Sequence, residues 1–230
     1  MQKIVDITDL SQPVKRPKKG YLFCKRALDI LMSLTVMAVL LPLSAVIAVI
    51  AAWDTKGSPL FVQQRIGRNL KPFKVLKFRT MKTNAPADKP TYLLDNHDRY
   101  ISRVGRCIRK LSLDEIPQLL NILKGDMSFV GPRPVVAGET ELIRLRNRIG
   151  ADIVRPGLTG LAQISGRDNV PVRRKAYLDR VYVDSMCMRA DARILLKTAV
   201  HVLTSRGIKE GANPRIAGTE RYKDADHKAI

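Results

Sequence analysis

The sequence is poor in cysteine, aromatic residues and acidic residues, and each shortage argues against a class of protein. The three cysteines, Cys24, Cys107 and Cys187, are odd in number and widely spaced, which predicts free thiols in a reducing compartment rather than a disulfide framework. Aromatic residues make up 5% of the chain, few for a protein that stacks on single-stranded bases. The sequence shows no zinc-finger spacing, and its three histidines do not cluster. Nucleic acid is therefore a disfavoured partner.

Acidic residues are also scarce, because 21 Asp and Glu stand against 41 Lys and Arg, for a net charge of +20. A chain this basic is expected to meet an anionic partner, either an acidic membrane surface or a phosphorylated substrate. Its 230 residues suffice for one domain with a proper core and one appended element. No internal repeat is visible.

A long uncharged run, residues 30–52, lies near the start of the chain, with Pro42 close to its middle. At about 1.5 Å per residue it extends roughly 35 Å as a helix, enough to cross a bilayer core of about 30 Å. The run is too long for a signal peptide, and no small-residue cleavage site follows it. Trp53, directly after the run, is expected to anchor it at the membrane interface.

Basic residues flank both ends of this run, so the positive-inside rule would keep both flanks in the cytoplasm. Both can lie there only if the segment turns back, and Pro42 is the expected hinge because it removes a helical hydrogen bond. A spanning helix stays as the alternative. The flanking basic residues are Lys15, Arg16, Lys18, Lys19, Lys25 and Arg26 before the run and Lys56, Arg65, Arg68, Lys71 and Lys74 after it.

Two adjacent carboxylates, Asp114 and Glu115, lie in SLDEIPQLLNILKGDMSFVGPRP, residues 112–134, with basic residues on either side. In so basic a chain, the pair suggests a site of chemistry. The alternative is a capping box, in which Ser112 and Glu115 begin a helix and both carboxylates complement its N-terminus. Pro117 argues that such a helix starts a residue or two later.

This stretch, with VLKFRTM before it and RPGLTGLAQISGR after it, resembles the bacterial sugar transferase family, the small monotopic phosphoglycosyl transferases. The resemblance covers residues 25–207. It implies transfer of a sugar-1-phosphate from a UDP-sugar to polyprenyl (undecaprenyl) phosphate with release of UMP, as the first membrane step of polysaccharide or glycoconjugate assembly. The implied fold is α-rich α+β, with a re-entrant membrane helix hairpin on one small cytoplasmic catalytic domain that carries a short β-hairpin and interfacial amphipathic helices.

The resemblance also implies roles for single residues. Asp114 would be the nucleophile and a ligand of Mg²⁺, and Glu115 the neighbouring acid or base. The family's Ser-Pro pair at the membrane hinge is Leu41-Pro42 here, so the proline is kept and the serine is not. The residues implied to bind substrate are Lys77, Arg79, Arg109, Arg133, Arg155, Gly157, Thr159, Gln163 and Arg167.

The rest of the pattern predicts how the domain is built. Strands at 59–65 and 72–78 form a hairpin, and the polar residues 81–98 form a loop that is a candidate lid. Residues 155–160, RPGLTG, are expected to form a rigid turn whose glycines let backbone amides approach an anion. Helical patterns occur at residues 99–110, 135–150 and 191–205. The predicted segments are a basic flexible arm at 1–24, the re-entrant helix at 25–56, the catalytic domain at 57–208 and a disordered tail at 209–230.

The expected location is the bacterial inner membrane, with the catalytic domain on the cytoplasmic face. The expected partners are the UDP-sugar, the polyprenyl phosphate and anionic lipid, with contacts to downstream glycosyltransferases and assembly into a homo-oligomer left open. Galactose, glucose and N-acetylated sugars stay open, as do capsule, exopolysaccharide and lipopolysaccharide pathways. The rival hypothesis is a membrane-attached basic adaptor or scaffold protein without catalysis.

Overall fold

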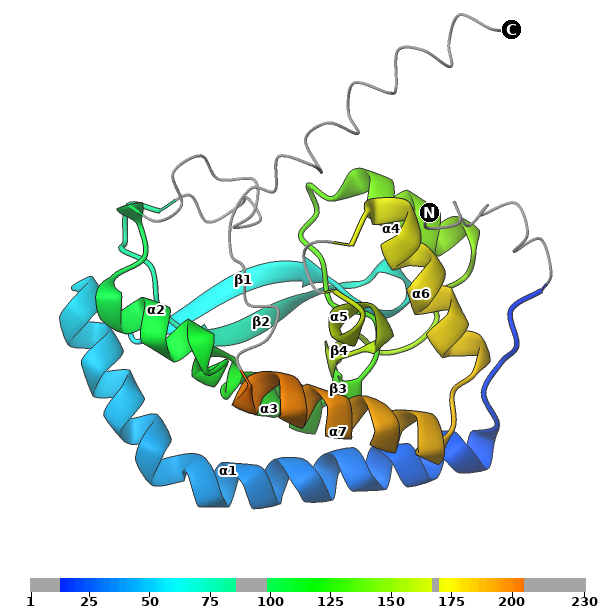
Figure 1. The fold of residues 1–230 in the computed structure, drawn as a ribbon, viewed down its shortest axis with the longest axis horizontal. Coiled ribbons are helices and arrows are strands. Elements are labelled where there is room, and N and C mark those ends of the chain that lie inside the picture. Colours follow the sequence, from blue (N-terminus) through cyan, green and yellow to red (C-terminus); the bar gives the residue numbers. More distant parts are fainter. Residues whose placement is uncertain (1–12, 86–98, 167–169, 205–230) are drawn as a thin grey trace, which may run out of the picture.

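The computed structural model describes residues 13–85, 99–166 and 170–204. Arg167, the candidate lid beyond residue 85 and the tail from residue 205 lie outside the described residues, as does the start of the basic arm. The fold is mostly helical with two small two-stranded sheets, which confirms the α-rich α+β prediction (Figure 1).

Helix α1, Lys19–Thr55, is one continuous helix of 37 residues with Pro42 inside it. Figure 1 shows that α1 bends sharply along its length without folding its two arms against each other. The element is therefore a bent helix rather than a closed hairpin, and it begins earlier than the predicted boundary at residue 25. Among the described residues, α1 is the one helix long and apolar enough to cross a membrane.

Both ends of α1 contact the same domain. Near its start, Lys25 Nζ lies 2.7 Å from Asp191 Oδ2, and both side chains are buried. Near its end, Ile47 is buried in a core cluster with residues of β2 and α2. Asp54, the penultimate residue of α1, accepts a hydrogen bond from the hydroxyl of Ser102, which caps α2. Between these attachments, Met32, Val36 and Met37 of α1 pack against the main core cluster.

The outer surface of α1 is apolar and uncovered. Of the most apolar 18-residue stretch of α1, only 11% is buried in the structure. Leu41 is 66% exposed and Trp53, the predicted interface anchor, is 85% exposed. An uncovered apolar surface of this extent is typical of a helix that contacts lipid.

The predicted hairpin is confirmed by β1, Leu60–Ile66, and β2, Pro72–Phe78, which pair antiparallel around a short 3-10 turn, Arg68–Leu70. Buried Asn121 of α3, Gln118–Lys124, attaches to β2 through its side-chain amide. Its Nδ2 donates to the carbonyl of Lys74 at 2.7 Å, and its Oδ1 accepts from the amide of Leu76 at 3.0 Å. These bonds fix β2 beside the segment that leads into α3.

A second sheet was missed by the sequence analysis. Strands β3, Ser128–Val130, and β4, Gly157–Thr159, pair in parallel. The turn predicted over 155–160 is therefore wrong in part, because Gly157 lies in a strand and its amide donates to the carbonyl of Pro132 at 2.9 Å. Glycine is required there since a Cβ would collide with the backbone of Gly131.

Five further helices complete the domain, and three of them match predicted helical patterns. They are α2, Arg103–Lys110; α4, Thr140–Arg148; α5, Leu161–Ile164; α6, Val172–Asp184; and α7, Met188–Leu203. Within α7, Ile194 is buried, but Leu196 is 68% exposed and Val200 is also exposed. Helix α7 is thus apolar on its outer side as well, and it runs alongside the first arm of α1 (Figure 1).

Candidate active site

The two carboxylates lie in a short 3-10 segment, Leu113–Glu115, and do not begin a helix as a capping box. Ser112 has a left-handed backbone, with φ of 55°, and its side chain makes no cap hydrogen bond. This conformation lets the chain turn directly from α2 toward α3, which begins after Pro117. The capping explanation for Ser112 and Glu115 is therefore wrong, and α3 begins at Gln118, further along than the residue or two predicted from Pro117.

Lys77 and Arg133 hold the carboxylate pair from two sides. Lys77 Nζ lies 2.8 Å from Glu115 Oε1 and 4.0 Å from Asp114 Oδ2. Arg133 Nη2 lies 3.2 Å from the same oxygen of Glu115. The Asp114 side chain is 9% exposed and that of Glu115 is 18% exposed. The two adjacent carboxylates and two cations from distant parts of the sequence thus form one largely enclosed cluster.

The electrostatics of this cluster keep Glu115 ionised. Burial favours its neutral form, but the charges of Lys77 and Arg133, together with their hydrogen bonds, outweigh burial and hold the pKa of Glu115 far below its usual range. At neutral pH, Glu115 is therefore a fixed negative charge between two cations.

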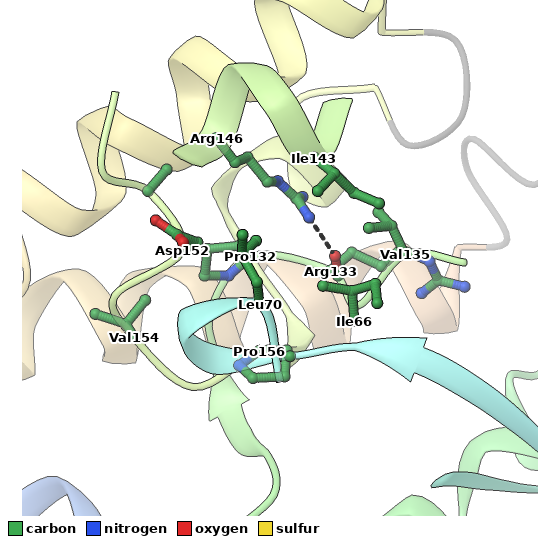
Figure 2. Close-up of a pocket in the computed structure, with 12 residues that line it drawn as sticks. Ile66, Leu70, Pro132, Arg133, Val135, Ile143, Arg146, Asp152, Val154 and Pro156 are labelled. Carbon is green, nitrogen blue, oxygen red and sulfur yellow. Dashed lines mark hydrogen bonds between the residues drawn. The ribbon is translucent and has the colours of Figure 1, made fainter. Parts of the chain in front are cut away.

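The backbone that carries Arg133 is fixed at successive carbonyls. Gly157 N donates to the carbonyl of Pro132 at 2.9 Å, and Arg65 Nη1 donates to that of Pro134 at 3.1 Å. Between them, Arg146 Nη1 donates to the carbonyl of Arg133 at 2.8 Å, the bond drawn in Figure 2. Pro132 and Pro134 restrict this backbone by their rings, and the three hydrogen bonds fix it further, which aims the guanidinium of Arg133.

Arg146 is itself held by a buried partner from α6. Its Nε lies 2.7 Å from Asp179 Oδ2 and its Nη2 lies 2.6 Å from the same oxygen. Asp179 is 1% exposed and Arg146 is 6% exposed. Removing one member of such a pair leaves an uncompensated buried charge, which costs about 3–5 kcal/mol. The chain of contacts from Asp179 through Arg146 to Arg133 therefore stabilises the wall of the site.

A cavity of about 400 Å³ lies beside the carboxylate pair. Besides Asp114 and Glu115, it brings together five of the predicted substrate-binding residues: Lys77, Arg109, Arg133, Thr159 and Gln163. Gln163 donates through Nε2 to the carbonyl of Leu158 at 3.0 Å, and its buried Oε1 has no hydrogen-bond partner among the described residues. The cavity therefore presents cations together with a polar acceptor.

Three other predicted residues lie elsewhere. Arg79 Nε donates to the carbonyl of Ser58 at 2.8 Å, and its guanidinium lies over the ring of Phe61. Arg155 Nε donates to the carbonyl of Gly125 at 2.8 Å, at the C-terminal end of α3. Gly157 belongs to β4. In this conformation these residues support the fold around the cavity and do not line it.

The arginines of α2 differ in exposure. Arg109 is half-buried and lines the cavity, whereas Arg103 and Arg106 are exposed.

Among the polar and charged residues that line the cavity, the sequence did not mark Arg146, Lys175, Thr198 and His201. They come from α4, α6 and α7, which are distant in sequence from the carboxylates. Thr198 is held by Thr159, with 2.6 Å between the two hydroxyl oxygens. No local pattern marks these residues, because their shared feature is the cavity that the tertiary fold creates.

Comparison with known proteins agrees with this geometry. The sequence profile described as Bacterial sugar transferase matches residues 20–205, so the chain belongs to the bacterial sugar transferase family. It is 39% identical to the exopolysaccharide production protein ExoY of Sinorhizobium fredii, over 80% of this chain and 87% of that protein. It is 38% identical to the undecaprenyl-phosphate galactose phosphotransferase of Salmonella typhimurium, over 83% of this chain but only 42% of that longer protein. The resemblance seen in the sequence is confirmed.

Proposed function

We propose that this protein transfers a sugar-1-phosphate from a UDP-sugar to undecaprenyl phosphate and releases UMP. The observation that carries the proposal is the position of Asp114, which is 6% exposed beside Lys77 and at the wall of a cavity that also reaches α1. Cations suit a diphosphate, and an apolar helix suits a lipid acceptor. Relatives named as undecaprenyl-phosphate galactose and glucose phosphotransferases support this reaction class.

The reaction proceeds in two displacements. An oxygen of Asp114 attacks the phosphorus that carries the sugar, the bond to the UMP oxygen breaks, and the electron pair leaves with UMP. A phosphate oxygen of the acceptor then attacks the same phosphorus and releases Asp114, which yields the undecaprenyl diphosphate sugar. Lys77 and Arg133 balance the negative charge that gathers around the phosphorus in both steps. The reaction thus needs Asp114 as a free carboxylate at its start and end.

Glu115 serves this mechanism better as a charged support than as the acid or base suggested by the family resemblance. A carboxylate whose pKa lies far below its usual range carries no proton to donate at neutral pH and is a weak base. Its oxygen at 2.8 Å from Lys77 and 3.2 Å from Arg133 instead sets where these cations stand. We therefore assign Glu115 the positioning of the two phosphate-binding cations.

The side chains at the site offer Mg²⁺ one carboxylate ligand, that of Asp114. No group of three or more His, Cys, Asp and Glu side chains gathers within the described parts of the chain. Mg²⁺ commonly takes one or two carboxylates together with substrate phosphates and water. Asp114 would hold it, since Glu115 Oε1 already accepts from Lys77 and Arg133. The bound ion would supply further charge neutralisation for the diphosphate.

Purified protein with Mg²⁺, undecaprenyl phosphate and a panel of UDP-sugars tests the reaction and identifies the sugar. We expect one or a few donors to release UMP in step with the formation of lipid-linked sugar, measured by a coupled UMP assay and by lipid extraction. Relatives named for galactose, glucose and N-acetylgalactosamine set the first donors to try. Absence of UMP with every donor, from folded protein in lipid nanodiscs, would favour the adaptor hypothesis.

We also propose that α1 enters and leaves the inner membrane on its cytoplasmic face, with the domain on that face. The support is that both arms of α1 attach to one domain, through Lys25 with Asp191 and through Asp54 with Ser102. A spanning helix would place these attachments on opposite sides of the bilayer. The helix contains Pro42 and bends along its length (Figure 1), which gives it the geometry for a return.

The native cysteines test this topology. Cys24 precedes the apolar run, Cys107 follows it in α2, and both are exposed. In variants that lack Cys187 and retain only one of the two, a membrane-impermeant maleimide should label neither cysteine in intact spheroplasts and each of them after permeabilisation. Labelling of just one from outside would mean that the helix spans the membrane.

The product places the protein at the start of polysaccharide assembly, since a lipid-linked sugar must be extended by later glycosyltransferases. Relatives named for exopolysaccharide production make exopolysaccharide the pathway we propose.

A further inference from the structure

The cavity beside Asp114 continues into an apolar limb between α1 and α7. Val36 and Leu40, one turn apart on α1, line one side. Leu195 and Val202, on one face of α7, line the other. All four side chains are half-buried. The lining of the cavity therefore combines the cations Lys77, Arg109 and Arg133 with aliphatic side chains from two helices, and Thr198 and His201 of α7 lie among the latter.

We propose that this apolar limb holds the first isoprene units of the acceptor lipid, and that Leu40 and Leu195 determine how well the lipid is bound. The inference rests on the proposed function and adds to it a binding site for the acceptor chain. A polyprenyl phosphate has the same two-part chemistry as the cavity, with an anionic head on an aliphatic tail.

The surroundings of the limb favour this occupant. Leu41 and Leu196, the neighbours of the two lining leucines, are 66% and 68% exposed on the outer faces of the same helices. The limb thus lies between helices whose outer faces are suited to lipid, so a chain can enter from the bilayer without crossing water. Thr198 and His201 add polar groups on the α7 side, whereas the side formed by Val36 and Leu40 is aliphatic and offers a hydrogen-bonding ligand no partner.

The two adjacent leucine pairs provide matched variants. Leu40→Trp and Leu195→Trp place bulk in the limb, whereas Leu41→Trp and Leu196→Trp place the same bulk on the outer faces. We expect the lining variants to raise the KM for undecaprenyl phosphate about tenfold, as expected for displacing one or two methylene groups from apolar walls. UMP release in the absence of acceptor should be unchanged, which also shows that the variants fold. The outer variants should keep the wild-type KM.

A photoreactive undecaprenyl phosphate with a diazirine in its first isoprene units gives a second readout that does not need turnover. In the wild type we expect labelled peptides that contain Leu40 and Leu195, and less label in the two lining variants. If this labelling occurs but no UDP-sugar yields UMP, the proposed reaction fails and the lipid site stands. Equal effects of lining and outer variants, or lining variants whose KM for undecaprenyl phosphate is unchanged, would overturn the lipid site.

Discussion

Replacing Asp114 with asparagine should lower the rate of UMP release by about a thousandfold or more, the scale seen when an enzyme loses its nucleophile. The amide keeps the size of the side chain but has no anionic oxygen to attack phosphorus. Incubation of the wild type with UDP-sugar labelled in the sugar, without acceptor, should leave an acid-labile label on Asp114. The Asp114→Asn variant should carry none, as measured by intact-protein mass spectrometry.

Asp126→Asn is the matched control for this loss. Asp126 lies just after α3, 3.6 Å from the exposed Lys124, and does not line the cavity. It should retain the wild-type rate and the label. Turnover by Asp114→Asn without a covalent adduct would instead support direct transfer between the two substrates, with Asp114 only a ligand of the cation.

Replacing Lys77 with methionine should lower kcat by about a hundredfold to a thousandfold, because a preorganised cation beside the reacting phosphate is lost. Its removal also frees Glu115 from its nearest positive charge, at 2.8 Å, so the pKa of Glu115 rises. In the wild type, protonation of Glu115 should not lower the rate above about pH 5. In the variant, the rate should begin to fall at a higher pH than in the wild type, because the pKa of Glu115 is higher. A pH–rate profile of UMP release measures both effects.

Lys74→Met is the control, since Lys74 lies on the same strand with an exposed side chain. The pH dependence of folding stability gives an independent check of the direction of the pKa shift of Glu115. The pKa of Glu115 is lowered on folding, so its ionised form stabilises the wild type above the reference pKa of 4.5, and this contribution is lost as pH falls below that value. The difference in Tm between wild type and Lys77→Met should therefore shrink on acidification. A constant difference would mean that Lys77 acts through packing alone.

Several features of the fold follow from local sequence. The hairpin of β1 and β2 was predicted to within a residue at its start, because strand propensity and the turn between the strands are short-range properties. Pro42 marked a kink, although the helix around it stays continuous, since packing of both arms on the domain maintains it. The strand at Gly157 was missed because its partner, β3, is distant in the sequence and too short to show a pattern.

The candidate site also contains residues that the sequence marks and residues that only the fold brings together. Asp114 and Glu115 stand out in the sequence because their charge contrasts with a basic chain, and motif resemblance added Lys77 and Arg133. The sequence by itself thus determined the apolar helix, the acidic pair and the family. Only the tertiary structure decided that Arg146 is aimed by Asp179 and that Leu40 and Leu195 face one cavity. These residues lie on different helices, and their side chains meet only when packing brings those helices together, which no local periodicity encodes.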